Sequence, residues 1–439
     1  MLHCGICRRN NRRFRLKIFG GQGIFNRKTD SRNNFGTRNK FGIRNNSKFD
    51  KIKISVILII LLVLKLCICD YITVYASETD DVSNVTDSVK KVIDTLDLSD
   101  LEKFLSDIDL LKNESVVSKL LSLITGDAKE DYSDIFSYIT SNIYSEISSI
   151  IPSVAIVLTL VIFLAVIEAV KSDKTKESVA NVCTIIGNVA VAGVIIVIFM
   201  REFYESKQVV EKMSEQIQIV FPIILTLMTA SGATAGVSIF KPSVSFLCNA
   251  VSVVYVKLLF PIILFILCFS ALNAFSSIIK TDKMSDFLKS AFKWIVGLSS
   301  VFFCFFVTAQ GIASSTYDTV SLRALKYAVG NSVPLINGLL SSGFDVVVAS
   351  CLLIKNALGT LSMIAIIYVV VMPLIKLVIL SLALRLLSGV TQSVASDSTI
   401  KLISATADAT TYLATALAVT AIVYIITILI TMCSMGASI

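Results

Sequence analysis

The 439-residue chain is 54% hydrophobic and only 16% charged, with a mean hydropathy of +0.78, which excludes an ordinary soluble domain and predicts several membrane spans. Its net charge of +8 comes from residues 1–53, which hold fifteen Lys and Arg residues against Asp30 and Asp50. The remainder is net acidic, so binding to nucleic acid has no support there. Because His3 is the only histidine, the apolar body cannot contain a Ser-His-Asp triad or a histidine zinc site.

Residues 1–53 form a basic, Asn-rich leader that cannot bury a hydrophobic core. Three interpretations remain open: a solvated tail, a start codon assigned upstream of the true one, or a patch that binds anionic lipid or nucleic acid. Cys4 and Cys7 beside His3 resemble half of a zinc site, but the second half is missing. We therefore expect no metal and no cofactor.

Residues 54–76 have the features of a signal peptide. Lys51 and Lys53 precede a short apolar core, and Val74-Tyr75-Ala76 places small residues where a signal peptidase cuts. We prefer this interpretation to a stable transmembrane helix, although Lys65 interrupts the apolar run. The acidic region at 77–150 is then exported.

The exported region has the spacing of amphipathic helices. One apolar stripe contains Leu98, Leu101, Leu105 and Ile108, and Ser99 with Glu102 fits a capping box. A second stripe recurs every four residues from 135 to 147. These stripes predict either the core of a small helical domain or a face that packs on the membrane surface or a partner.

Residues 151–439 predict an all-α polytopic membrane domain built from repeated two-span hairpins, at about 152–200, 261–313 and 373–432. The prolines that begin the hairpins are 109 and 112 residues apart. An amphipathic segment at 201–220 is expected to lie in the membrane interface.

Before the second and third hairpins we expect broken or re-entrant limbs, at about 222–259 and 334–372. Pro222 and Pro261 are 39 residues apart, and so are Pro334 and Pro373. Glycine and proline mark breaks in membrane helices. The expected breaks are Pro222, Gly232, Gly236, Pro242, Pro261, Pro334, Gly343 and Pro373.

Lysines near the hairpin turns predict the topology. By the positive-inside rule the turns face the cytoplasm, and both ends of the mature chain are extracytoplasmic. The topology anchors are Lys171, Lys174, Lys176, Lys280, Lys283, Lys289, Lys293 and Lys401.

Polar side chains at membrane depth are costly and are the candidate functional positions. They are Lys257, Asp345, Lys355, Asn356, Lys376 and Asp408. We expect Lys376 and Asp408 to pair or to line one polar cavity, either fixing helix register or taking part in conduction. Glu168 and Arg385 lie near cytoplasmic ends, where snorkelling explains them.

Motifs for catalysis are missing from the sequence, which has no phosphate loop, dinucleotide fingerprint or zinc ligand set. We therefore expect a protein that is not an enzyme.

Three ordered motifs carry a family resemblance. They are Val333-Pro334-Leu335-Ile336-Asn337-Gly338, Lys355-Asn356-Ala357-Leu358-Gly359 and Pro373-Leu374-Ile375-Lys376. With the signal-like segment and the Ala/Thr-rich last span, the sequence over roughly 54–439 resembles the stage III sporulation protein AE family. The long leader departs from the family pattern.

The resemblance implies a multi-pass protein made in the mother cell and embedded in the membrane around the forespore. It would belong to a channel or secretion-like complex that supports late forespore development. The implied partners are other membrane proteins of that complex and membrane lipid, without nucleic acid; a homo-oligomer is a further option. The alternative function is a small-molecule or ion transporter, favoured by membrane repeats and broken helices near buried charges.

Overall fold

Apolar side chains dominate this chain without the alternation of a half-buried strand, and the described residues form helices and no strand. The computed structural model describes residues 82–108, 114–125, 129–169, 177–232, 234–275, 281–332 and 337–433. All of them belong to one contact unit, Ala76–Ile439. The predictions for the leader 1–53 and the signal peptide 54–76 concern residues outside these ranges.

The helical elements differ greatly in length. In chain order they are α2 (Val82–Ile93), α3 (Ser99–Asp107), α4 (Val116–Thr125), α5 (Lys129–Ala169), α6 (Glu177–Ala230), α7 (Thr234–Val251), the π-helical η3 (Ser252–Leu259), α8 (Phe260–Phe275), α9 (Asp282–Ser332), α10 (Asn337–Thr391) and α11 (Asp397–Cys433). Within the described residues, six helical stretches are long and apolar enough to cross a membrane. The predicted all-α polytopic class is therefore confirmed.

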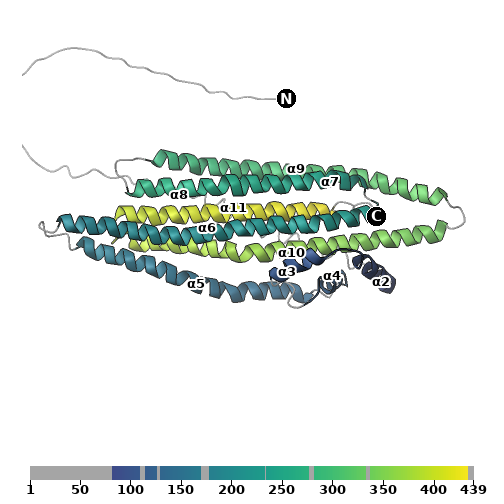
Figure 1. The fold of residues 1–439 in the computed structure, drawn as a ribbon, viewed down its shortest axis with the longest axis horizontal. Coiled ribbons are helices and arrows are strands. Elements are labelled where there is room, and N and C mark those ends of the chain that lie inside the picture. The colour runs from purple at the N-terminus through teal and green to yellow at the C-terminus, as the bar shows by residue number, and fades with distance from the viewer. Residues whose placement is uncertain are drawn as a thin grey trace, which may run out of the picture. The chain divides into compact units, whose positions relative to one another are not determined.

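Three pairs of consecutive helices lie side by side: α5 with α6, α8 with α9, and α10 with α11 (Figure 1). Each pair overlaps one of the hairpins expected at about 152–200, 261–313 and 373–432, but the helices extend beyond those bounds. Helix α10 is central, because it also packs against α5, α6, α9, α2 and α4. The chain thus places its first and last spans around one shared helix.

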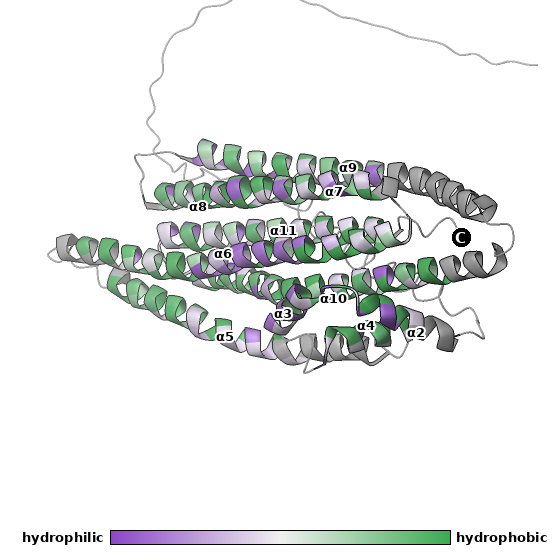
Figure 2. Ribbon diagram, turned by 45° about the vertical axis from the view of Figure 1, so that its right-hand side comes forward, coloured by the Kyte–Doolittle hydropathy of each residue, from purple (hydrophilic) through white to green (hydrophobic). Residues whose placement is uncertain are grey.

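Helices α6 and α10 are much longer than a bilayer is thick. They contain 54 and 55 residues, about 80 Å each at 1.5 Å per residue, against a hydrocarbon core of about 30 Å. The segment 201–220, expected in the membrane interface, is part of α6. Its apolar stripe packs inside the bundle, where Val210 and Met213 are completely buried. Figure 2 shows a hydrophilic stretch in the middle of α6, between hydrophobic segments.

The expected breaks at proline are largely absent. Helices α6, α7 and α10 run through Pro222, Pro242 and Pro373. A proline inside a helix loses one hydrogen bond and clashes with the carbonyl four residues earlier. In a membrane helix, neighbouring groups and local widening absorb that cost, and the wider π-helical turn of η3 ends just before Pro261.

The two expected limbs have different structures. In 222–259 the chain turns at Gly232, whose φ of 89° favours glycine, and then continues as α7 and η3. In 334–372 the described part belongs to the unbroken α10, which includes Gly343. Gly236 lies within α7, and Pro334 is outside the described residues. The prediction of a second broken limb is therefore wrong for residues 337–372.

The region expected to be exported, 77–150, contributes three short helices and the start of α5. Leu101 and Leu105 of the predicted stripe are buried, and α3 packs against α6. The expected capping box is not formed, since Ser99 is the first helical residue and donates to the Asp97 carboxylate from both its backbone N–H and its hydroxyl. Helix α5 is continuous across residue 150 into the first span.

Candidate functional site: buried charges that join α6, α10 and α11

Lys376 of α10 lies between two carboxylates of α6. Its Nζ is 3.3 Å from Glu202 Oε1 and 2.5 Å from Glu205 Oε2. The side chains of Lys376 and Glu202 are each only 7% exposed, whereas Glu205 is 37% exposed. Glu202 and Glu205 are three residues apart, so they share one face of α6. This group of three charges is called the α6–α10 charge cluster below.

The depth of this cluster can be estimated from the helix turns. Glu202 lies about 38 Å along α6 from Glu177, and Lys376 about 23 Å from Thr391 at the end of α10. The first distance is longer and the second is shorter than the thickness of a bilayer core, about 30 Å. A bilayer core that began at the hairpin turns would therefore end near the cluster.

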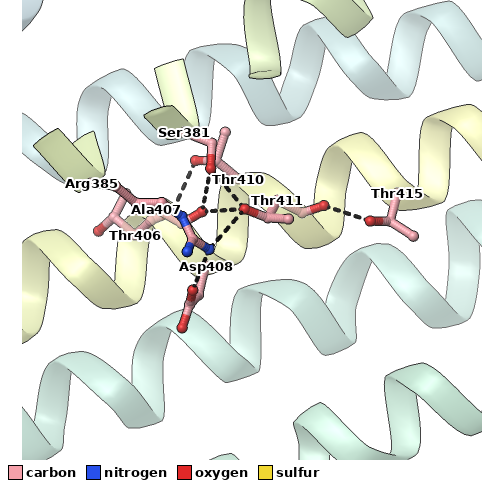
Figure 3. A network of polar contacts seen from close by, with 8 residues as sticks. All are labelled: Ser381, Arg385, Thr406, Ala407, Asp408, Thr410, Thr411 and Thr415. Carbon is pink, nitrogen blue, oxygen red and sulfur yellow. Dashed lines mark hydrogen bonds and ion pairs between the residues drawn. The ribbon is translucent and has the colours of Figure 1, made fainter. Parts of the chain in front are cut away.

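A second charged contact joins α10 to α11 (Figure 3). Arg385 Nη2 donates to Asp408 Oδ1 at 2.9 Å and to Thr411 Oγ1 at 3.4 Å. Ser381 lies one turn before Arg385, with its hydroxyl 2.7 Å from Thr411 Oγ1 and 3.1 Å from the Ala407 carbonyl. Arg385 and Asp408 are 40% and 39% exposed. This ion pair is consequently half solvated, unlike the Lys376–Glu202 pair.

Threonine hydroxyl groups of α11 form hydrogen bonds with the backbone of the same helix. Thr406, Thr410 and Thr415 each donate to the backbone carbonyl four residues earlier. Such bonds allow a hydroxyl to be buried in an apolar bundle without an unpaired donor. Helix α11 can therefore pack closely against α10 while carrying many polar atoms.

The expected contact between Lys376 and Asp408 is not formed. Each residue has a different partner: Lys376 contacts α6, and Asp408 contacts Arg385. Arg385 was expected to snorkel, but it reaches Asp408 instead. Lys376 and Arg385 are nine residues apart on α10, about 14 Å along the axis, so the two charged contacts are separate.

Further along the same interface, Lys355 is 1% exposed and donates from Nζ to the Met432 carbonyl at 3.0 Å. Gln216 of α6 donates to the Ser362 carbonyl at 2.7 Å. Gly359 lies so close to Met432 that an added Cβ would overlap its side chain. Asn356, one residue after Lys355, is half-buried. Polar contacts therefore bind α10 to both α6 and α11.

The remaining predicted positions are not gathered into this site. Lys257 is exposed on η3, and the side chains of Asp345 and Glu168 lie outside the described side chains. Among the topology anchors, Lys283, Lys289, Lys293 and Lys401 lie at the beginnings of α9 and α11. Lys171, Lys174, Lys176 and Lys280 fall outside the described residues.

Glu202 and Glu205 were missed as candidate residues because the segment around them was interpreted as an interfacial helix. A signal was present, since Glu202 and Ser206 lie on the same helical face as Phe203, Val210 and Met213. A carboxylate on the apolar face of a helix requires a buried partner. In the described residues, no group of three or more His, Cys, Asp or Glu side chains could hold a metal ion.

Comparison with known proteins identifies a family for this chain. Residues 115–436 match the family model described as stage III sporulation protein AE. Stage III sporulation protein AE of Bacillus subtilis (strain 168) is 22% identical over 242 residues, which cover 54% of this chain and 60% of that protein. No solved structure matches the chain. Since the family model spans most of the sequence and nearly all described helices, the chain belongs to the stage III sporulation protein AE family.

Proposed function

We propose that this chain is a non-enzymatic component of a sporulation channel or secretion-like complex that links the mother cell and the forespore. Family membership implies a role in sporulation, and six apolar helical stretches in the described residues indicate a multi-pass membrane protein. The proposal has three further parts. The complex links two compartments, this chain lies in the membrane around the forespore, and the chain is needed in late forespore development. Its proposed partners are other membrane proteins of the complex, with self-association as a further option.

The observation that carries the proposal is the closed packing between α6, α10 and α11. A cavity between Gln216, Phe221, Ser362 and Thr431 has a volume of about 10 Å³, enough for about one water molecule. Lys355 and Gln216 are held by hydrogen bonds across the same interface. This interface is therefore too closely packed to conduct larger molecules. A conduit for them is better formed between this chain and other chains of the complex.

The transporter alternative is favoured by the α6–α10 charge cluster. It contains two carboxylates and one ammonium group, so these three groups carry a net charge of −1 when all are ionised. Buried charges of this kind occur along ion and proton pathways. A cation or proton that neutralised one of these carboxylates would weaken its contact with Lys376. Binding of that cation or proton would then be coupled to movement of α10 against α6.

Reconstitution of the purified full-length chain in liposomes distinguishes the two functions. The proposal predicts no solute uptake by the chain alone, and co-isolation with other sporulation membrane proteins from sporulating cells. Saturable uptake by the chain alone that is lost in Glu202→Gln, and retained in Glu146→Gln outside the cluster, would establish the transporter. Absence of any co-isolated membrane protein would contradict the assembly.

A further inference from the structure

We infer that a cavity bordered by the α2–α3 turn, α6 and η3 binds a Lys- or Arg-bearing segment of a partner protein. This acidic cavity has a volume of about 710 Å³, which is in the range of a ligand-binding pocket. The inference rests on the proposed role in an assembly, because it names the chemistry by which one partner would be recognised.

The cavity forms where a short helix of the exported region meets the long α6. Asp97 and Asp100 line it from the turn before α3 and the first turn of that helix. Glu211 and Glu215 line it from one face of α6, four residues apart. The third wall includes Ser252 of η3. Three separate parts of the chain therefore contribute to one concave surface.

Its charges are of one sign. The four carboxylates lie in its wall, and none of the described lining residues is Lys or Arg. Lys207 approaches Glu211 to 3.6 Å from outside the wall, and both side chains are largely exposed. The hydrogen bonds from Ser99 hold the pKa of Asp97 below its usual value, which keeps this carboxylate ionised at neutral pH. A cationic ligand is the complementary one.

A buried hydroxyl with incomplete hydrogen bonding lies behind the wall, against two residues that line the cavity. Tyr424 of α11 is fully buried, and its hydroxyl lies against Ser214 and Ser252, both of which line the cavity. It forms no hydrogen bond of good geometry with either. A buried hydroxyl without such a bond is costly. A ligand that reorients Ser214 or Ser252 would let Tyr424 complete its hydrogen bonds.

The distribution of the wall residues favours a peptide segment over a metal ion. The carboxylates occupy different walls, and in the described residues no three acidic groups converge to hold a metal. Leu96, Ile219 and Val256 also line the cavity, and their apolar side chains suit the aliphatic stems of Lys or Arg. The chain's own basic leader precedes the predicted signal peptide and is predicted on the other side of the membrane, so a partner protein is the favoured source.

Peptide binding to the full-length chain in phosphatidylcholine nanodiscs tests the inference. The probe is a fluorescent peptide of alternating lysine and alanine, with a glutamate–alanine peptide for comparison and spermine as competitor. Asp100→Asn with Glu215→Gln removes two wall charges. The matched control, Glu102→Gln with Asp107→Asn, removes two exposed charges of α3 outside the cavity. Thr226→Trp fills the cavity without changing its charge.

The expected result is binding of the lysine peptide that weakens about 10-fold or more in the wall double variant and in Thr226→Trp, while the control stays within about twofold. Weak displacement by spermine supports a peptide segment. No binding, or equal losses in wall and control variants, would overturn the inference. Displacement by spermine as strong as by unlabelled peptide would assign the cavity to free polyamines instead. Because the isolated chain is used, these outcomes are independent of the co-isolation that tests the proposed function.

Discussion

Helices α11 and α9 are both apolar enough to span a membrane, yet they occupy opposite environments. The apolar window of α11 has a hydropathy of 2.6 and is 61% buried, whereas that of α9 has a hydropathy of 1.8 and is 18% buried. On α11 the buried side chains include Ala409, Ala416 and Thr420. On α9, Trp294 is 77% exposed and Phe305 is 73% exposed.

The sizes of the side chains give a physical reason for this difference in burial. Small residues let helices approach closely inside a membrane bundle, and the threonines of α11 bond to their own backbone. Large apolar side chains on α9 are suited to contact with lipid. The central α10–α11 pair is therefore expected to respond strongly to substitution, and α9 only weakly.

Loss of the central ammonium should have the largest effect. Lys376→Met leaves Glu202 buried without its partner, and removal of one member of a buried ion pair costs about 3–5 kcal/mol. Thermal unfolding of the purified protein in detergent measures the change. The control is Lys283→Met on α9, where the lysine is exposed. Equal unfolding temperatures for the two variants would contradict the central role of Lys376.

Close packing between α10 and α11 should produce the next largest effect. In Gly359→Ala the new methyl group overlaps Met432, and overpacking of a core costs about 1–3 kcal/mol. Gly297→Ala on α9 is the matched control, because nothing lies within 4 Å of the added atom. The control should keep or slightly raise its stability, since alanine is favoured over glycine in helices by up to about 1 kcal/mol. The same unfolding assay decides, and a neutral Gly359→Ala would argue against this contact.

The half-exposed ion pair of Arg385 and Asp408 should matter less. Both side chains are about two-fifths exposed, at 40% and 39%, so solvent screening limits their coupling to about 1 kcal/mol or less. A double-mutant cycle with Arg385→Ala and Asp408→Ala measures it. A coupling as large as the Lys376→Met effect would contradict the separation between a buried and a solvated charged contact.

The smallest change in stability is expected on α9 itself, within about 0.5 kcal/mol for Trp294→Phe. Trp294 is the single tryptophan of the chain, so its fluorescence reports one position. Brominated phosphatidylcholine should quench it strongly because its ring is exposed. A tryptophan introduced by Tyr424→Trp in the Trp294→Phe background should be protected, since Tyr424 is buried. Equally weak quenching at both positions would mean that Trp294 of α9 is also buried in an interface.

Local sequence patterns were sufficient for much of this fold. Runs of apolar residues predicted an all-α polytopic membrane protein, and six long apolar helical stretches in the described residues agree with that class. Local patterns were insufficient for helix continuity, because a proline such as Pro222 or Pro373 breaks a helix only when neighbouring helices cannot compensate for the lost hydrogen bond. Tertiary packing of α10 against α6 decides whether the helix continues through the proline. A local sequence pattern does not contain information on that packing.

The candidate site was predicted in part for a similar reason. Lys376 and Asp408 were recognised because charges are rare in apolar spans. Their partners depend on which helices become neighbours: Glu202 was assigned to a membrane surface, and Arg385 to a snorkelling position. Both belong to pairs that join residues far apart in the chain.

The central claim is that Lys376 joins α10 to α6. It is tested most directly by two double-mutant cycles on unfolding free energy, one combining Lys376→Met with Glu202→Gln and the other combining it with Asp408→Asn. The buried contact predicts a coupling of about 1–3 kcal/mol for the first cycle and less than about 0.5 kcal/mol for the second. A strong coupling between Lys376 and Asp408, with none between Lys376 and Glu202, would contradict it.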